Sequence, residues 1–379
     1  MMITYKFRLY PTKEQKEKLL ETLEICRQTY NYFLSRIEES KQTLNRLNLQ
    51  TELPKLKKEK PELEKVYSKV LQMVLYQLYS NLKALSKLKK NGKKVGKLRY
   101  KGKWFKTFVY NQSGFKIIKT GKRLDKLHLS KIGGMPIRIH RPIDGKMKQI
   151  IIKKHNSGKW FACICVERKV KTFRRKPKKV IGIDVGIKHF LTDSKGRQIE
   201  NPKLYMKTLE RIKIEQKRLS RKKKGSKNYE KQRKKLAKKY EKLVNQRDDF
   251  LHKLSRFYVD NYDVICVENL NIRNMVKNHS LAQKILDASW GKFLQMLEYK
   301  AENAGVRVVK VNPRGTSKGL SYKNKLRDWI SANRILMKGR AYPDSLLERR
   351  PLLRIISYKE VVSGQVFSMN QEAPCESWG

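Results

Sequence analysis

Three short segments each place one acidic residue beside apolar residues, and they constrain the fold more than any other feature of the chain. Asp184 follows Val180-Ile-Gly-Ile and Glu268 follows Val264-Ile-Cys-Val, so each acid ends a β-branched run that predicts a buried strand. Asp328 lies in a segment that predicts the start of a helix. Carboxylates gathered at strand ends can hold Mg²⁺ for phosphodiester chemistry. The three segments therefore predict a metal-dependent nuclease centre.

Each acid alone also has an ordinary structural interpretation. Asp184 lies between Gly182 and Gly186, where a backbone or a phosphate can approach closely, and it also fits a turn aspartate. Glu268 ends a central-strand pattern, where a buried acid needs a cation or a partner. Asp328 also fits a helix N-terminal acid favoured by the helix dipole. If the three carboxylates lie close together, a metal site is favoured over these separate structural roles.

The charge balance restricts the partners of the chain. Its 379 residues include 90 Lys and Arg against 34 Asp and Glu, a formal net charge of +56, and 39% of the residues are hydrophobic. Self-repulsion of this size destabilises a compact free state unless a polyanion neutralises it. DNA or RNA is therefore the expected partner. No apolar run approaches the length of a membrane-spanning helix, so no membrane partner is expected.

The cysteines and the start of the sequence indicate a compartment. The start has no signal-peptide core, and no Cys-x-x-Cys pair occurs. Neither a disulfide framework nor a zinc ribbon is encoded, so we expect no zinc and a reducing, cytoplasmic location. The five cysteines are Cys26, Cys163, Cys165, Cys266 and Cys375.

The chain reads as a mixed α/β protein of several domains. Residues 1–10 and 98–178 alternate in strand-like patterns between glycines and predict a small antiparallel barrel. Residues 11–97 predict a helical region, in which Thr12 caps the first helix. Residues 179–338 predict an RNase H-like sheet, and 339–379 have no convincing periodicity and predict a poorly packed tail.

Two basic regions predict contacts with phosphates. A long helical stretch over 204–259 is interrupted near Gly225, and its Lys217–Lys239 part contains a single acid, Glu230. Interleaved apolar residues favour a helical hairpin that lines a phosphate channel over a flexible arm. Aromatic residues around Trp104 fit either base stacking or barrel core. The residues expected to bind nucleic acid are Arg99, Lys101, Lys103, Lys217, Arg218, Arg221, Lys222, Lys223, Lys224, Lys234 and Lys235.

Several blocks of the sequence resemble the TnpB (OrfB) proteins of bacterial and archaeal insertion sequences. The resemblance spans about residues 2–336. The blocks are Tyr5-x-x-Arg8-x-Tyr-Pro11-Thr12, Cys26-Arg27-x-x-Tyr30-Asn31, Asp184-Val-Gly186-Ile-Lys, Val267-Glu268-Asn-Leu270, Asp287-Ala-Ser-Trp290 and Asn312-Pro-Arg-Gly-Thr316-Ser317.

The resemblance implies an RNA-guided, Mg²⁺- or Mn²⁺-dependent DNA endonuclease associated with transposition, with guide RNA and double-stranded target DNA as partners. It implies a wedge barrel with an inserted helical recognition domain, followed by a RuvC-like nuclease domain. Asp184, Glu268 and Asp328 fall where the family keeps its catalytic, metal-binding acids. A prokaryotic, nucleoid-associated location follows from the same resemblance.

Two departures from the family bear on activity. The family usually has a four-cysteine zinc finger between the Thr316-Ser317 block and the last acid, whereas here a short cysteine-free segment leads directly to Asp328. Ile330 stands where the family has Asn. The leading interpretation is an endonuclease, and the alternative is a nuclease-impaired protein that binds DNA through a guide and acts by occupancy. A strand-transfer transposase ranks last, because no Tyr or His pair resembles its nucleophile.

Overall fold

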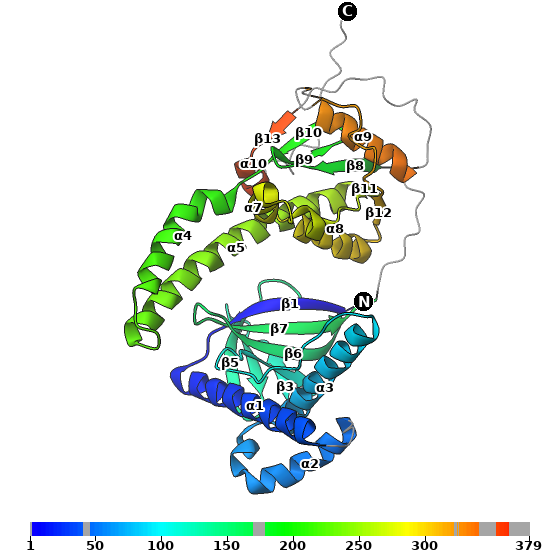
Figure 1. Cartoon of the computed structure of the whole chain (residues 1–379). Helices are drawn as coiled ribbons and strands as arrows, with labels where there is room; N and C mark the ends of the chain where they lie inside the picture. The colour runs from blue at the N-terminus through cyan, green and yellow to red at the C-terminus, as the bar shows by residue number, and fades with distance from the viewer. Residues whose placement is uncertain are drawn as a thin grey trace, which may run out of the picture. The chain divides into compact units, whose positions relative to one another are not determined.

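The chain divides into two compact units, residues 1–169 and 170–379, and each is described by itself (Figure 1). The computed structural model describes residues 2–40, 46–169, 179–321, 324, 326–340 and 354–363. The boundary falls between residues 169 and 170, and residues 170–178 lie outside the described residues.

The first unit is built on one antiparallel sheet of seven strands. Strand β1 pairs with β7 along its whole length and with β5 near its end, and the strand order is β2-β6-β7-β1-β5-β4-β3. The antiparallel β structure expected after residue 98 is confirmed. The strands are β1 (Met2–Leu9), β2 (Thr107–Asn111), β3 (Phe115–Ile118), β4 (Asp125–Leu129), β5 (Gly133–Arg138), β6 (Lys146–Lys154) and β7 (Trp160–Glu167).

The helices of the first unit share a core with this sheet. Thr12 caps α1 as expected, because its hydroxyl accepts from the Gln15 amide at 3.3 Å while the Thr12 amide donates to Gln15 Oε1 at 3.0 Å. Leu23 and Val70 lie in the same buried cluster as the sheet residue Phe108, so the helices pack on the sheet. The helices are α1 (Lys13–Glu39), α2 (Arg46–Glu59), the 3₁₀ helix η1 (Pro61–Lys65) and α3 (Ser68–Lys90).

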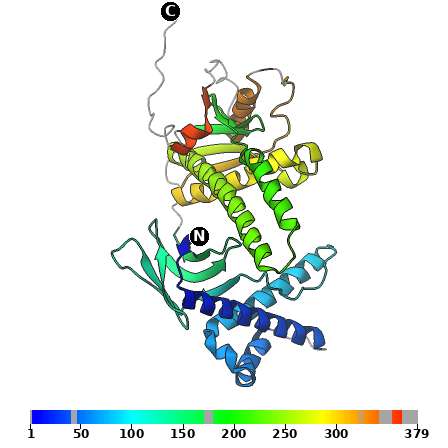
Figure 2. The same ribbon diagram turned by 90° about the vertical axis from the view of Figure 1, so that its left-hand side faces the viewer.

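The second unit is built on a mixed six-stranded sheet with the order β12-β11-β8-β9-β10-β13. Figure 2 shows α4 (Leu204–Ser220) and α5 (Lys227–Asn261) as two long helices that lie side by side. Strands β8, β11 and β12 are mutually parallel, while β9 is antiparallel to both β8 and β10. The strands are β8 (Val180–Val185), β9 (His189–Asp193), β10 (Arg197–Glu200), β11 (Val264–Glu268), β12 (Arg307–Val311) and β13 (Arg354–Ile356).

Helices cover both faces of this sheet. One face packs on α5 and α8 through a large apolar cluster, and the other packs on α9 through a smaller cluster that includes Cys266 and Ile335. Residues 279–304 form two helices, because Ser289 adopts a left-handed conformation with φ +58° between them. The helices are α4 (Leu204–Ser220), α5 (Lys227–Asn261), α6 (Ile272–Met275), α7 (His279–Ala288), α8 (Trp290–Ala304), α9 (Arg327–Arg340) and α10 (Tyr358–Ser363).

The expectation of a poorly packed tail from residue 339 is wrong for 354–363. Strand β13 pairs in parallel with β10, and Ile356 and Val361 are buried in the core that α5 and α8 cover. The segment is too short to show a periodicity, and its burial comes from the edge of a sheet formed far earlier in the chain. The rest of that region, 341–353 and 364–379, lies outside the described residues. Within the described part of the chain, every helix is too short or too polar to cross a membrane.

Candidate active site and basic surfaces

Strand alternation places Asp184 on the face of the sheet that α9 covers. Ile181 and Ile183 point into the core with α5 and α8, whereas Val180 packs with α9. Because successive side chains of a strand point to opposite faces, Asp184 lies on the same face as Val180. It is half-buried there.

Glu268 reaches the same face from the neighbouring strand. In β11, Ile265 and Val267 point to the α5 side and Cys266 points to α9, so Glu268 also lies on the α9 side. The parallel register pairs Cys266 with Gly182, and Val267 with Ile183. Continuing this register by one residue brings Glu268 beside Asp184, as the sequence predicts for acids at neighbouring strand ends.

Two glycines allow α9 to lie directly on these strands. A Cβ atom at Gly182 would lie 2.1 Å from the Ala332 carbonyl oxygen and 2.8 Å from the Leu336 amide nitrogen. A Cβ atom at Gly339 would lie 2.3 Å from Cys266 Sγ. Neither position accepts a side chain without moving the helix. The close approach allowed by Gly182, foreseen in the sequence for a backbone or a phosphate, is therefore taken by the helix that carries Asp328.

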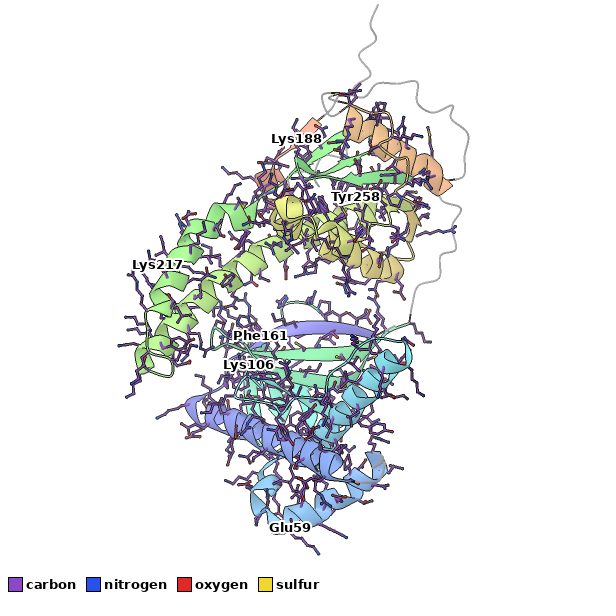
Figure 3. All side chains as sticks on the ribbon, in the orientation of Figure 1. Glu59, Lys106, Phe161, Lys188, Lys217 and Tyr258 are labelled. Carbon is purple, nitrogen blue, oxygen red and sulfur yellow. The ribbon has the colours of Figure 1, made fainter. Side chains whose placement is uncertain are left out.

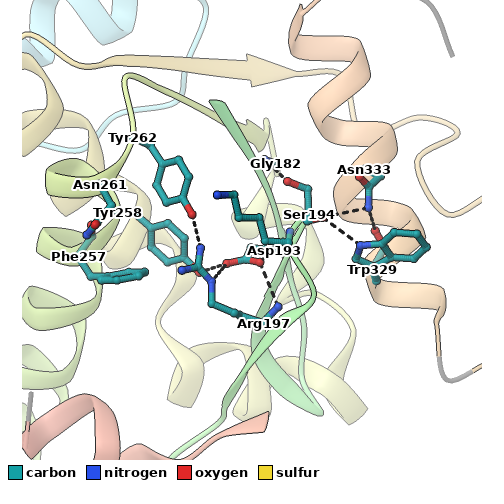
Figure 4. A network of polar contacts seen from close by, with 11 residues as sticks. Gly182, Asp193, Ser194, Arg197, Phe257, Tyr258, Asn261, Tyr262, Trp329 and Asn333 are labelled. Carbon is teal, nitrogen blue, oxygen red and sulfur yellow. Dashed lines mark hydrogen bonds and ion pairs between the residues drawn. The ribbon is translucent and has the colours of Figure 1, made fainter. Parts of the chain in front are cut away.

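The start of α9 is anchored to the turn after β9 (Figure 4). Trp329 Nε1 donates a hydrogen bond to the Ser194 carbonyl oxygen at 3.0 Å, and Asn333 Nδ2 approaches the same oxygen at 3.5 Å. The Ser194 hydroxyl accepts from the Gly182 amide at 3.1 Å. Ser194 therefore ties the strand that carries Asp184 to the first turn of α9, which contains Asp328.

A buried charge supports this anchor. Asp193 is fully buried, and its carboxylate accepts from Arg197 Nε at 2.6 Å, from the Tyr258 hydroxyl at 3.0 Å and from the Lys195 amide at 3.0 Å (Figure 4). A buried carboxylate is tolerated only when it is paired and hydrogen-bonded in this way. The network fixes the turn that presents Ser194, and no local sequence pattern distinguishes Asp193 from a solvent-exposed acid.

The electrostatics of the acidic cluster favour a cation. Burial and the charges of Glu268 and Asp328 together raise the pKa of Asp184 to about 8, against the opposing charge of Arg327. The pKa of Glu268 is raised by burial, against the hydrogen bond from Thr316 and the charge of Lys338. Repulsion between clustered carboxylates is relieved by a bound divalent ion. The charges of Glu268 and Asp328 thus both act on Asp184.

The loop before α9 contacts both sides of the cluster. Thr316 Oγ1 donates to Glu268 Oε1 at 2.5 Å, and the hydroxyls of Ser317 and Ser331 lie 2.9 Å apart. The Thr316-Ser317 block therefore links the end of β11 to α9. Only the tertiary structure assigns it this role, because Thr316 and Glu268 are 48 residues apart.

The donor set of the cluster fits a hard divalent cation, because carboxylate oxygens are the ligands that Mg²⁺ and Mn²⁺ prefer. In the part of the chain that the structure describes, no group of three acid, histidine or cysteine side chains is placed so that it could hold a metal ion. Among the described residues, Cys26, Cys163, Cys165 and Cys266 form no disulfide. The ligand set and the absence of zinc are therefore predictions from residue chemistry.

The basic hairpin is formed by α4, α5 and the turn between them, residues 204–261. Its predicted phosphate-binding side chains are solvent-exposed along both helices and at the turn; they are Lys217, Arg218, Arg221, Lys222, Lys223, Lys224, Lys234 and Lys235 (Figure 3). Leu236 and Tyr240 pack inside the hairpin with Ile212, as the interleaved apolar pattern predicts.

One buried acid, which the sequence did not reveal, organises the cations of the basic hairpin. The Glu215 carboxylate accepts from Gln232 Nε2 at 2.6 Å and lies 3.0 Å from Lys239 Nζ. These two hydrogen bonds lower the pKa of Glu215 below its ordinary range. Arg218 and Lys235 also lie within 4 Å of the same carboxylate. Two of the predicted phosphate ligands are thus already held by an internal carboxylate.

Asp287 holds the base of the hairpin. Its carboxylate accepts from the Tyr205 amide at 3.0 Å and from Arg247 at 3.0 Å. No side chain within α4 caps its start, since the preceding residue, Lys203, has φ +45°. Asp287 therefore caps α4 from another helix. This explains the Asp in the Asp287-Ala-Ser-Trp290 block.

Arg99, Lys101 and Lys103 lie far from both of these regions in the chain. They belong to the first unit, in the segment between α3 and β2. Arg99 and Lys103 are exposed, and Lys101 is half-buried. The predicted basic residues are therefore divided between the two units.

Comparison with known proteins identifies the class and then the family. Residues 163–279, which contain Asp184 and Glu268, match the OrfB_IS605 model, described as "Probable transposase", and residues 1–43 match its helix-turn-helix domain. Residues 290–335, which contain Asp328, match the Cas12f1-like TNB domain. The three family models thus match three different parts of the chain.

Two curated relatives align over most of the chain. A protein of Streptomyces pristinaespiralis named "Putative RNA-guided DNA endonuclease" is 30% identical over 320 residues, covering 81% of this chain and 77% of the relative. The InsQ protein of Escherichia coli K12, with the same description, is 27% identical over 346 residues and covers 84% and 82%. The chain therefore belongs to the OrfB IS605 family. A solved Cas12f1–sgRNA–target DNA complex aligns with a TM-score of 0.46 at 13% identity, covering 88% of this chain and 98% of that chain.

Proposed function

We propose that the chain is an RNA-guided DNA endonuclease of an insertion sequence, with Asp184, Glu268 and Asp328 as its catalytic acids. The proposal rests on the parallel register of β8 and β11, which brings Glu268 beside Asp184, and on the charge of Asp328, which acts on Asp184. Endonuclease names of relatives that span most of the chain support the same activity.

The three acids would hold Mg²⁺ or Mn²⁺, which supplies an activated water and stabilises the leaving oxygen when bound. The protein positions these carboxylates. Thr316 orients Glu268, and Ser194 with Trp329 fixes the helix that carries Asp328. Like charges raise the pKa of Asp184, so the cluster favours cation binding over three free carboxylates. No zinc is expected, and elemental analysis of the tag-free protein tests this.

The partners in this proposal are a guide RNA and double-stranded target DNA. Guide pairing supplies the choice of sequence, while the exposed cations of the basic hairpin bind the backbone. The net charge of +56 supports a bound polyanion. The strand order β10-β9-β8-β11-β12 supports a RuvC-like nuclease domain. We assign the first unit as the wedge and recognition part, and we expect the protein in the prokaryotic cytoplasm with the nucleoid.

The test is plasmid cleavage beside a gel shift on the same preparation. Co-purifying RNA is sequenced first, to define the guide and a matched target. Asp184→Ala and Asp328→Ala should each reduce cleavage by more than about 100-fold, because even outer-shell partners of metal ligands cost about 10–100-fold. Guide and target binding should survive. Asp260→Ala, an exposed acid at the end of α5 that pairs with Arg256, is the matched control and should cut normally.

The second candidate function is guide-directed binding without cleavage. It is favoured by the cysteine-free segment before Asp328 and by the lack of a closed metal-ligand set among the described side chains. The same assay separates the two functions. Tight binding of matched DNA by the unaltered protein, with no nick in Mg²⁺ or Mn²⁺, would leave only the occupancy function.

A further inference from the structure

Trp104 is the one exposed tryptophan among the residues that the structure describes. Trp160, Trp290 and Trp329 are at most 7% exposed, whereas Trp104 is 61% exposed. Burial of an indole ring is strongly favourable, so a ring left in solvent lacks a large hydrophobic stabilisation. Such a side chain is enriched where one face of the ring meets a partner.

The segment that carries Trp104 is firmly held by α1. The Lys101 amide donates to Asn31 Oδ1 at 2.6 Å, and the Lys101 carbonyl oxygen accepts from Asn31 Nδ2 at 3.0 Å and from Arg27 at 3.2 Å. The Tyr100 hydroxyl donates to Glu38 at 2.7 Å. These contacts give a role to the Cys26-Arg27-x-x-Tyr30-Asn31 block. They fix the segment before binding, which lowers the entropy cost of an interaction.

The ring itself lies against its own turn. The Phe105 amide donates to the Gly102 carbonyl oxygen at 3.0 Å and closes a tight turn. A Cβ atom at Gly102 would lie 3.0 Å from Trp104 Nε1, so glycine allows this contact. The Lys101 ammonium lies 5.3 Å from the centre of the Trp104 ring and 4.8 Å from that of Tyr30. Trp104 is therefore held in place while most of its surface stays in solvent.

The chemistry around the ring selects the partner. Residues 93–106 contain no acid, and their cations are Lys93, Lys94, Lys97, Arg99, Lys101, Lys103 and Lys106. A fixed aromatic ring among cations is the arrangement that binds single-stranded nucleic acid, where bases stack on the ring and cations contact phosphates. A neutral protein surface would gain nothing from these charges.

We propose that Trp104 is a stacking platform for an unpaired nucleobase, with Lys101 and Lys103 contacting the adjoining phosphates. The inference rests on the proposed function, since the base would belong to the guide RNA or to an unpaired stretch of target DNA. It adds a base-contacting site in the first unit to the phosphate-binding basic hairpin of the second.

The test measures binding of oligomers about 12 nucleotides long, a length within the usual range of single-strand sites. The probes are uridine RNA, thymidine DNA and abasic strands with the same two backbones. Nucleic-acid-free full-length protein is prepared in high salt, and binding is measured by fluorescence anisotropy without divalent ions. Trp104→Ala should weaken binding of base-bearing strands by about 5- to 150-fold. Its binding of abasic strands should change by less than about twofold, because the charges remain.

Two matched variants complete the design. Trp104→Phe keeps a ring and should retain most of the preference for base-bearing strands. Tyr76→Ala removes another exposed aromatic ring of the first unit, 51% exposed on α3, and should leave that preference unchanged. A loss confined to RNA assigns the site to the guide, and a loss confined to DNA assigns it to the target.

The proposal is overturned if Trp104→Ala leaves the preference for bases intact, or if it weakens abasic and base-bearing strands equally. Both readouts are independent of cleavage. If the unaltered protein does not cut matched DNA, the proposed endonuclease function is wrong, but the preference for base-bearing strands is unaffected. The failure of one proposal can therefore be told apart from the failure of the other.

Discussion

The second unit holds buried carboxylates in two opposite electrostatic settings. In the acidic cluster, burial and two neighbouring acids raise the pKa of Asp184 to about 8. In the basic hairpin, hydrogen bonds from Gln232 and Lys239 lower the pKa of Glu215. The Glu215 carboxylate is already paired with cationic side chains of the protein, so its role is within the fold. Asp184 has acids as its neighbours, and this difference marks the acidic cluster as the place where an external cation is expected.

The largest expected effect tests how the acidic cluster is assembled. Gly182→Ala should destabilise the protein by about 3 kcal/mol, the upper end for overpacking, because the new Cβ meets the backbone of α9. Moving α9 should also displace Asp328, so cleavage should fall steeply. Thermal unfolding and plasmid cleavage measure the two effects. Gly96→Ala is the control, since a Cβ at Gly96 meets nothing within 4 Å, and a similar loss there would refute the packing argument.

The next effect tests the raised pKa directly. Asp184 binds a proton more readily in the folded than in the unfolded protein, so the metal-free protein should lose stability as the pH rises from about 4 through 8. Asp184→Asn should remove this slope and stabilise the metal-free protein at pH 9 by roughly 1–3 kcal/mol. Unfolding at several pH values in chelator is the measurement. Equal slopes for the two proteins would mean that Asp184 is not electrostatically strained.

The opposite dependence of stability on pH is expected in the basic hairpin. Because the pKa of Glu215 is lowered in the fold, its contribution is present near neutral pH and is lost as the pH falls below 4.5. Glu215→Gln should cost about 1–2 kcal/mol at pH 7 and little in acid. Hydrogen exchange along α4 and α5 reports this local loss. Glu210→Gln, an exposed acid of the same helix, should cost less than about 0.5 kcal/mol, and a larger cost there would remove the contrast.

The smallest effect concerns the anchor of α9. Trp329→Phe removes the hydrogen bond to the Ser194 carbonyl oxygen and should cost about 1 kcal/mol of stability. If that bond positions Asp328, the Mg²⁺ concentration for half-maximal cleavage should rise, while binding of guide and target stays unchanged. A loss of stability with an unchanged Mg²⁺ requirement would limit Trp329 to a packing role.

Local sequence patterns determined much of this molecule. The β-branched runs before Asp184 and Glu268 predict the two central strands, because the apolar pattern of a buried strand lies in consecutive residues. Thr12 and the Gly225 interruption likewise predict a helix start and a helical hairpin that the structure contains. The three acids could be named in advance, since each lies in a short and distinctive block.

Only the tertiary structure decided how these parts meet. Gly182 allows close packing of a helix that lies about 150 residues later in the chain. The pairing of Glu215 depends on cations of α5, and β13 forms a strand because it pairs with the edge strand β10. Such contacts join residues far apart in the chain, and no local pattern encodes them. The sequence therefore determined which side chains could do chemistry, whereas packing between distant elements determined which acids would be paired and which would be left facing one another.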